Sequence, residues 1–241
     1  MRNRPEAGLE GLVSGMRTIF LIGDSTVEDN KPPFRGWGWA LPRYVQEDVK
    51  VRNCALSGRS SRSFREEGLF APVEKELSAG DLLLIQFGHN DEKDDERHTD
   101  PDTTFPEELW RYCAFALERQ AQPVLFTPVS RRFFVGKDSM MYTHGEYPRA
   151  IRKLAAEKNV PLVDLKKVSR ELYLSLGEEK TAELFVRLKP GENPDFPEGH
   201  DDKTHFNEYG ADVICRLAVK EMRGIPACAA MLKEDGCGEK A

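Results

Sequence analysis

Short apolar runs alternate along this chain with longer helical patterns, and this alternation limits the fold more than any other feature. The apolar runs, rich in residues that favour strands, are Ile19–Ile22, Val49–Cys54, Leu82–Phe87, Pro123–Phe126 and Val160–Val163. The helical patterns cover Trp37–Glu47, Pro106–Gln120, Tyr147–Lys158, Leu165–Leu176 and Glu208–Arg223. Strands that alternate with helices form βαβ units with parallel strands. The sequence therefore predicts an α/β fold with a mostly parallel sheet.

The length of 241 residues is sufficient for one domain with a single large core. We expect one domain over residues 1–241, with a core at about 16–225 and flexible ends at 1–15 and 228–241. No apolar run approaches the roughly 18 residues that a membrane span needs, so we expect no membrane insertion. The N-terminal residues lack the apolar stretch of a secretory signal, which predicts a cytoplasmic protein.

The charge and the cysteines exclude further classes of protein. A formal net charge of −6 and the lack of a basic stripe argue against a nucleic-acid partner. The five cysteines are odd in number and contain no C-x-x-C pair, which argues against a disulfide scaffold or a zinc site. The histidines show no H-E-x-x-H spacing. We therefore expect neither a metal nor another cofactor.

The first apolar run ends abruptly in Gly23-Asp24-Ser25, which places a serine at the carboxyl end of a strand. Open α/β sheets collect their active-site groups at this edge. Ser25 is therefore a candidate nucleophile. The alternative is a structural one, because serine is also favoured as the N-cap of a helix.

An acid and a base lie three positions apart near the other end of the chain, at Asp202 and His205. In a serine-histidine-aspartate triad, the histidine takes the proton of the serine and the aspartate orients the imidazole. Ser25, His205 and Asp202 are therefore the predicted catalytic residues. The alternative is an exposed histidine in a loop, with Asp202 as the cap of that loop.

Two further polar turns follow the second and third predicted strands. Acyl transfer needs donors for the oxyanion that forms in the transition state. We expect these donors to be the N–H groups of Ser25 and Gly58 and the side-chain amide of Asn90. Gly58 suits this position because it has no Cβ to obstruct the substrate. Gly58 and Asn90 are also common turn residues, so a purely structural reading stays open.

These residues, in this order, resemble the signature blocks of the SGNH (GDSL-type) hydrolases, and their context resembles the rhamnogalacturonan acetylesterase branch. The resemblance implies a three-layer α/β/α flavodoxin-like fold with a mostly parallel five-stranded sheet. It also implies a metal-free serine esterase that removes acetyl groups from pectic oligosaccharides through an acetyl-enzyme intermediate. The stretches that carry it are Gly23-Asp-Ser-Thr26, Ser57-Gly-Arg-Ser-Ser-Arg-Ser-Phe64, Phe87-Gly-His-Asn-Asp91, Tyr147–Leu154, Val160–Leu165 and Asp202-x-x-His205.

Three further residues are expected to contact the substrate. Arg59 follows the second strand, and its planar guanidinium suits a sugar carboxylate. His89 lies beside Asn90, and Trp37 could stack on a sugar ring. Each also has a structural alternative, namely an internal ion pair for Arg59, a satisfied structural histidine for His89, and packing onto the first helix for Trp37.

Two other functions are compatible with the sequence. One is an SGNH esterase or lysophospholipase of broader specificity, although residues 57–65 are polar and rich in arginine, with no apolar flap for an acyl chain. The other is a catalytically silent carbohydrate-binding protein on the same fold. The second is disfavoured because no catalytic block is broken.

Overall fold

A computed structural model of the chain describes residues 16–137 and 139–234. Its central sheet has five strands in the order β2-β1-β3-β4-β5, and every neighbouring pair is parallel. This confirms the predicted α/β sheet. The strands are β1 (Arg17–Gly23), β2 (Val49–Asn53), β3 (Leu82–Gln86), β4 (Gln122–Phe126) and β5 (Leu162–Val163).

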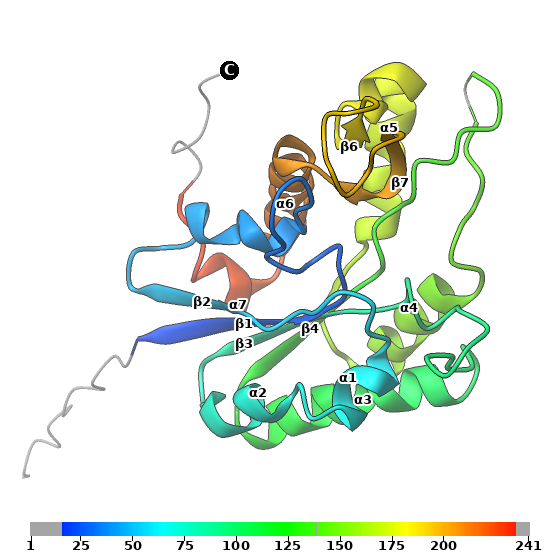
Figure 1. Ribbon diagram of the computed structural model, residues 1–241. Coiled ribbons are helices and arrows are strands. Elements are labelled where there is room, and N and C mark those ends of the chain that lie inside the picture. The colour runs from blue at the N-terminus through cyan, green and yellow to red at the C-terminus, as the bar shows by residue number, and fades with distance from the viewer. Residues whose placement is uncertain (1–15, 138, 235–241) are drawn as a thin grey trace, which may run out of the picture.

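Helices cover both faces of the sheet, which produces three layers (Figure 1). One face carries α1 (Ser61–Glu66), α2 (Ala71–Glu76), α3 (Thr104–Glu118) and α4 (Tyr147–Lys158). The other carries η1 (Trp37–Trp39), η2 (Leu41–Arg43), α5 (Leu165–Ala182), α6 (Glu208–Met222) and α7 (Pro226–Ala229).

The apolar character of the strands follows from this layering. Successive side chains of a strand point to opposite faces. Ile19 and Leu21 of β1 belong to the core under α5 and α6, whereas Phe20 and Ile22 belong to the core over α3 and α4. Both faces of the sheet are buried here, so residues 19–22 of β1 are all apolar rather than apolar at alternate positions.

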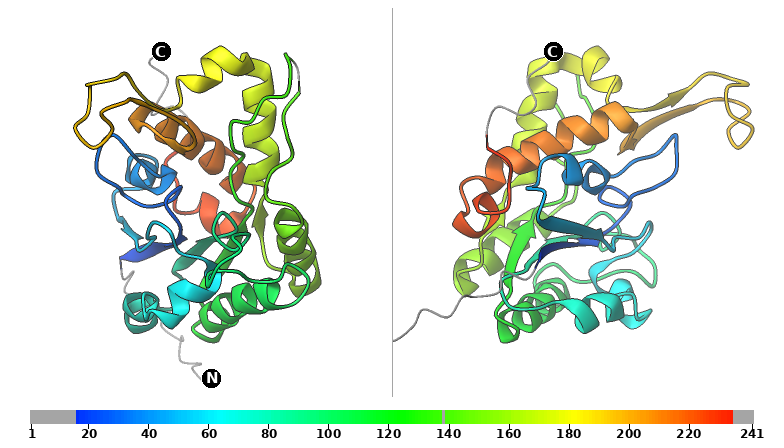
Figure 2. Two further views of the ribbon diagram at one scale, coloured as in Figure 1. Left: turned by 45° about the vertical axis from the view of Figure 1, so that its right-hand side comes forward. Right: turned by 90° about the vertical axis from the view of Figure 1, so that its left-hand side faces the viewer.

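A two-stranded antiparallel sheet lies outside the central one. It consists of β6 (Phe185–Leu188) and β7 (His200–Phe206), and its connecting loop projects from the body of the molecule (Figure 2). Its inner end is anchored, because Phe206 is buried and packs on Phe185 with ring centroids 5.1 Å apart. Phe206 O also accepts the N–H of Arg35 at 2.9 Å. β7 is therefore fixed next to the segment that follows β1.

Two predicted elements differ in the structure. Residues 37–47 form two short 3-10 turns, η1 and η2, rather than one helix. Pro42 lacks a backbone N–H, and Gly38 packs directly against the carbonyl of Val27, so an α-helix is interrupted here. The helix expected at 165–176 extends to Ala182, with a break at Gly177, where φ is 76°.

The sequence predicts a flexible end from residue 228 onward, and the structure packs the part of this end that it describes onto the core. Cys228, Met231 and Leu232 are buried, and Met231 O accepts the N–H of Gln46 at 3.0 Å. These apolar side chains close the core beside η2, which explains why the segment is ordered. The ends expected at 1–15 and 235–241 lie outside the described residues. Within 16–137 and 139–234, no helix has the length and apolar character to cross a membrane.

Candidate active site

The structure brings Ser25, His205 and Asp202 together, although 180 residues separate the first two. Ser25 Oγ lies 2.9 Å from His205 Nε2, and His205 Nδ1 lies 2.8 Å from Asp202 Oδ2. With the proton of His205 assigned to Nδ1, the serine donates to Nε2 and the imidazole donates to the carboxylate. This arrangement can transfer the proton of Ser25 to His205 and stabilise the resulting imidazolium.

Asp202 is kept in its ionised form by hydrogen bonds from the turn that it begins. Its Oδ1 accepts the backbone N–H groups of Thr204 and His205, at 2.7 and 2.8 Å. Burial alone would raise the pKa of Asp202, but these bonds and the hydrogen bond from the His205 ring hold it well below its usual range. Asp202 is therefore ionised at any pH near neutrality and available to orient His205.

The turn that carries Ser25 is fixed by its neighbours Asp24 and Thr26. The Oδ1 atom of Asp24 accepts the N–H of Thr26 at 2.9 Å and its hydroxyl at 2.8 Å. Thr26 Oγ1 in turn accepts an N–H of Gln86, and Gln86 accepts the indole N–H of Trp37. This buried chain of hydrogen bonds joins β1, β3 and η1 below the nucleophile. Ser25 thus sits on a rigid turn at the β1/β3 switch point of the sheet.

The two other strand-end loops lie at the same edge. Gly58 has a φ of 78°, and a Cβ built on it would meet nothing within 4 Å. Asn90 Nδ2 donates to the carbonyl of Arg59 at 3.0 Å, which ties the loop after β3 to the loop after β2. Asp91 strengthens this tie, because it accepts both the N–H and the hydroxyl of Ser61. The backbone N–H of Gly58 and the amide of Asn90 remain candidates for oxyanion donors.

Arg59 lies on the rim of this region but is already paired. Its Nε and Nη2 donate to Glu67 at 3.0 and 2.6 Å, and its Nη1 donates to the carbonyl of Ser57. Arg65 is likewise engaged by Glu108. The internal ion pair, which the sequence left as the alternative, is therefore present for Arg59 in this structure.

The structure does not support contact between Trp37 and a sugar. Its side chain is only 1% exposed and stacks on Phe126, with ring centroids 5.2 Å apart. The indole N–H is satisfied by Gln86, so Trp37 belongs to the core beneath the Ser25 turn. Packing, the alternative stated from the sequence, is what the structure contains.

His89 is also buried, within a row of basic side chains along the sheet edge. Its Nδ1 lies 2.9 Å from His144 Nε2, and His144 Nδ1 lies 2.9 Å from Lys166 Nζ. Burial lowers the pKa of both histidines, and it lowers that of Lys166 to about 7. His89 Nε2 is buried without a hydrogen-bond partner among the described residues. A direct contact between His89 and substrate would thus require a movement of the residues that cover it.

Two residues contact the segment of Asp202 in ways that the sequence did not predict: Arg132 was considered only as part of a positive field for sugar carboxylates, and His200 only as a surface histidine. Arg132 Nη2 donates to Asp201 Oδ1 at 2.6 Å and to the carbonyl of Asp202 at 3.1 Å, so it holds β7 onto the loop after β4. His200 Nε2 lies 3.0 Å from Asp202 Oδ2. Neither residue belongs to a recognisable motif. A histidine two positions before the catalytic aspartate was the only signal available.

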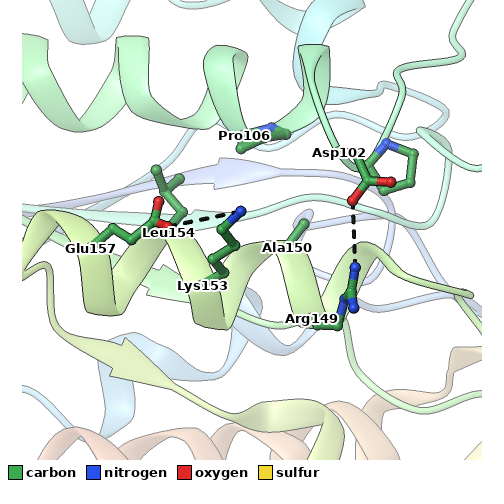
Figure 3. A pocket seen from close by; sticks show the side chains of 8 residues that line it. Asp102, Pro106, Arg149, Ala150, Lys153, Leu154 and Glu157 are labelled. Carbon is green, nitrogen blue, oxygen red and sulfur yellow. Dashed lines mark ion pairs between the residues drawn. The ribbon is translucent and has the colours of Figure 1, made fainter.

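A pocket elsewhere on the molecule does not belong to this site. Residues of α4 and of the segment at the start of α3 line a hollow of about 130 Å³ (Figure 3). Two ion pairs cross it, Arg149–Asp102 at 3.5 Å and Lys153–Glu157 at 3.8 Å. None of the triad or oxyanion candidates lines it. In the part of the chain that the structure describes, no three His, Cys, Asp or Glu side chains are arranged to hold a metal ion.

Comparison with known proteins gives consistent matches. The sequence model of the GDSL-like Lipase/Acylhydrolase family matches residues 21–213. The chain is 41% identical to rhamnogalacturonan acetylesterase RhgT of Bacillus subtilis (strain 168), over 90% of this chain and 95% of that protein. It is 36% identical to the probable rhamnogalacturonan acetylesterase YesY of the same organism, over 90% of this chain and 98% of that protein.

A solved structure with a similar fold agrees with these matches. The crystal structure of YxiM from Bacillus subtilis superposes with a TM-score of 0.75 at 30% sequence identity. The match covers 88% of this chain and 58% of that one. These matches agree with the structure itself, namely with the three-layer fold, the family motifs and the clustering of Ser25, His205 and Asp202 at one sheet edge.

Proposed function

Because this chain belongs to the GDSL-like lipase/acylhydrolase family, we propose that it is a carbohydrate O-acetylesterase acting on pectic oligosaccharides of the rhamnogalacturonan type. The observation that carries the proposal is the hydrogen-bonded series Ser25–His205–Asp202, at 2.9 and 2.8 Å. The substrate class is supported by the names of two relatives, RhgT and YesY, which align over 90% of this chain.

The reaction would proceed in two steps through Ser25. In the first, Ser25 Oγ attacks the acetyl carbonyl while His205 Nε2 takes the serine proton. His205 then gives this proton to the sugar oxygen as the bond between that oxygen and the acetyl carbon breaks, which leaves an acetyl-serine. In the second step, His205 takes a proton from water as the water oxygen attacks the acetyl group. His205 then gives this proton to Ser25 Oγ as the bond between Oγ and the acetyl carbon breaks, which releases acetic acid that ionises to acetate in solvent.

The negative charge on the carbonyl oxygen would be stabilised by the N–H groups of Ser25 and Gly58 and by the amide of Asn90. Gly58, whose φ of 78° favours glycine, has no side chain of its own to cover this N–H. The amide of Asn90 is oriented by its bond to Arg59 O and keeps a second N–H for the substrate. Donors of this kind typically contribute about 2.7–4 kcal/mol each to the transition state.

The direct test is acetate release from acetylated rhamnogalacturonan oligosaccharides by the wild type and by Ser25→Ala. We expect the variant to lose activity by a factor of about 10⁴ or more, since the nucleophile is removed. Ser175→Ala is the matched control, because Ser175 is exposed on α5 and bonds only to the carbonyl of Leu172 among the described contacts. This control should retain full activity.

The choice of esters separates this function from the broader one. An acetylesterase for sugars should release acetate from the oligosaccharides much faster than fatty acid from long-chain acyl esters or lysophospholipids. The reverse preference would overturn the substrate class but leave the serine mechanism intact. Acetate release that persists undiminished in Ser25→Ala would overturn the mechanism itself.

A further inference from the structure

A second imidazole contacts the carboxylate of the proposed triad. His200 Nε2 lies 3.0 Å from Asp202 Oδ2, the same oxygen that binds His205 Nδ1. The other oxygen already accepts two backbone N–H groups, those of Thr204 and His205. A carboxylate offers about four lone-pair sites to donors. His200 thus occupies the fourth lone-pair site of Asp202, so that all four sites of the carboxylate accept a hydrogen bond.

The ring of His200 is itself held in place by aromatic neighbours. Phe196 lies against it with ring centroids 4.6 Å apart, and Phe34 meets it edge-on at 6.1 Å. Phe34 also meets the His205 ring edge-on, at 5.8 Å. One phenylalanine therefore contacts both imidazoles that share Asp202. This packing keeps His200 Nε2 directed at the carboxylate instead of toward solvent.

We propose that His200 is a positioning residue of the esterase, which orients Asp202 and weakens its hold on protonated His205. The inference rests on the proposed Ser25–His205–Asp202 triad. A second N–H donor on Asp202 Oδ2 withdraws negative charge from the oxygen that stabilises the imidazolium. Protonated His205 then gives its proton to the departing sugar oxygen more readily.

The two imidazoles share one carboxylate oxygen of Asp202 as their hydrogen-bond partner. The charged groups beside His200 line a cavity of about 590 Å³ with it and carry both signs. They are Arg187, Lys189, Glu192, Glu198 and Asp201.

Two substitutions separate the hydrogen bond of His200 from its packing. His200→Phe keeps a ring between Phe34 and Phe196 but removes the donor. His200→Gln places an amide N–H at nearly the position of Nε2, so it keeps a donor that cannot titrate. In His200→Phe we expect kcat to fall about tenfold, the size of effect typical of one lost hydrogen bond to a charged group, with KM changed less than twofold.

His200→Gln should recover most of kcat. The proton on His205 Nδ1, whose NMR signal we expect far downfield, gives a readout that needs no substrate. It should move further downfield in His200→Phe, because Asp202 then bonds to one imidazole instead of two, and stay near its wild-type position in His200→Gln. Equal loss of kcat in both variants, or an unmoved proton signal in His200→Phe, would overturn the proposal. If the wild type cleaves no acetyl ester, the function fails separately and the NMR result still decides the position of His200.

Discussion

At the scale of single residues, Asn90 connects two loops that carry the proposed oxyanion donors. Its Nδ2 donates to Arg59 O at 3.0 Å, and its Oδ1 accepts an N–H of Arg97 at 3.4 Å. The side chain is 8% exposed, so its amide is fixed before substrate arrives. A donor that is already oriented needs no reorganisation as the oxyanion forms, which is the condition for strong stabilisation of a transition state.

We predict that Asn90→Ala lowers kcat by about 10² to 10³ and changes KM little, because the second amide N–H would act on the transition state alone. Steady-state kinetics on an acetylated oligosaccharide measures both constants. Asn193→Ala, in the loop between β6 and β7, is the control and should behave as the wild type. A loss confined to KM would assign Asn90 to ground-state binding instead.

At the scale of elements, the segment before η1 lies in direct contact with the turn that carries Ser25. Gly36 donates its N–H to the carbonyl of Glu28 at 2.8 Å. A Cβ built on Gly36 would come within 2.3 Å of the carbonyl carbon of Val27. The φ of Gly36 is −88°, so it is this close approach and not the backbone conformation that requires glycine. The nucleophile turn is therefore positioned by backbone packed on backbone.

Gly36→Ala should consequently displace the Ser25 turn. We expect the free energy of unfolding to drop by about 1–3 kcal/mol, as for overpacking in a core, and kcat to fall with it. Urea unfolding and steady-state kinetics measure the two effects. Gly224→Ala provides the comparison, since the nearest atom to its built Cβ is the carbonyl oxygen of Glu221 at 3.3 Å. If both variants were equally stable and active, the close contact at Gly36 would not determine the position of Ser25.

At the scale of the whole molecule, the central sheet could be predicted because its strands are apolar on both faces. Helix α4 was predicted with the bounds that it has in the structure, Tyr147–Lys158. The hairpin β6–β7 was not predicted, because β7 reads His-Asp-Asp-Lys-Thr-His-Phe and only Phe206 is fully buried. A strand with no apolar alternation has no periodic signal. Its pairing with β6 depends on tertiary contacts that a sequence pattern does not contain.

The candidate site likewise contains residues that a sequence pattern indicates and residues that only tertiary contacts bring together. Ser25, His205 and Asp202 were predicted because each belongs to a short motif at the end of a segment. The contact of Arg132 with Asp201 could not be predicted, because the two residues are 69 positions apart and nothing in the sequence relates them. Trp37 was predicted to contact the substrate, with packing as the alternative. The sequence does not show whether an aromatic residue near a predicted sheet edge faces solvent or the core. Burial decides between these readings, and burial requires the whole fold.

The molecule also buries titratable groups whose effects on stability oppose one another. Burial raises the pKa of Asp24 and of Asp91 to about 6. Their carboxyl groups bind protons more tightly in the folded state, so both reduce stability as the pH rises toward 6. Burial lowers the pKa of Lys166 to about 7. Its amine binds protons more weakly when folded, so it adds stability as the pH rises above 7.

The contribution of Asp24 can be isolated with Asp24→Asn. The pKa of Asp24 rises from 3.8 to about 6 on folding, so the wild type loses stability between these values as the pH increases. The loss amounts to about 3 kcal/mol, at about 1.4 kcal/mol per unit. Asparagine does not titrate, yet its carbonyl can still accept the N–H and hydroxyl of Thr26. The free energy of unfolding of Asp24→Asn, relative to the wild type, should therefore rise by that amount between pH 4 and pH 7, as measured by urea unfolding. A difference that stays flat over this range would mean that this buried carboxyl is ionised at no cost to folding.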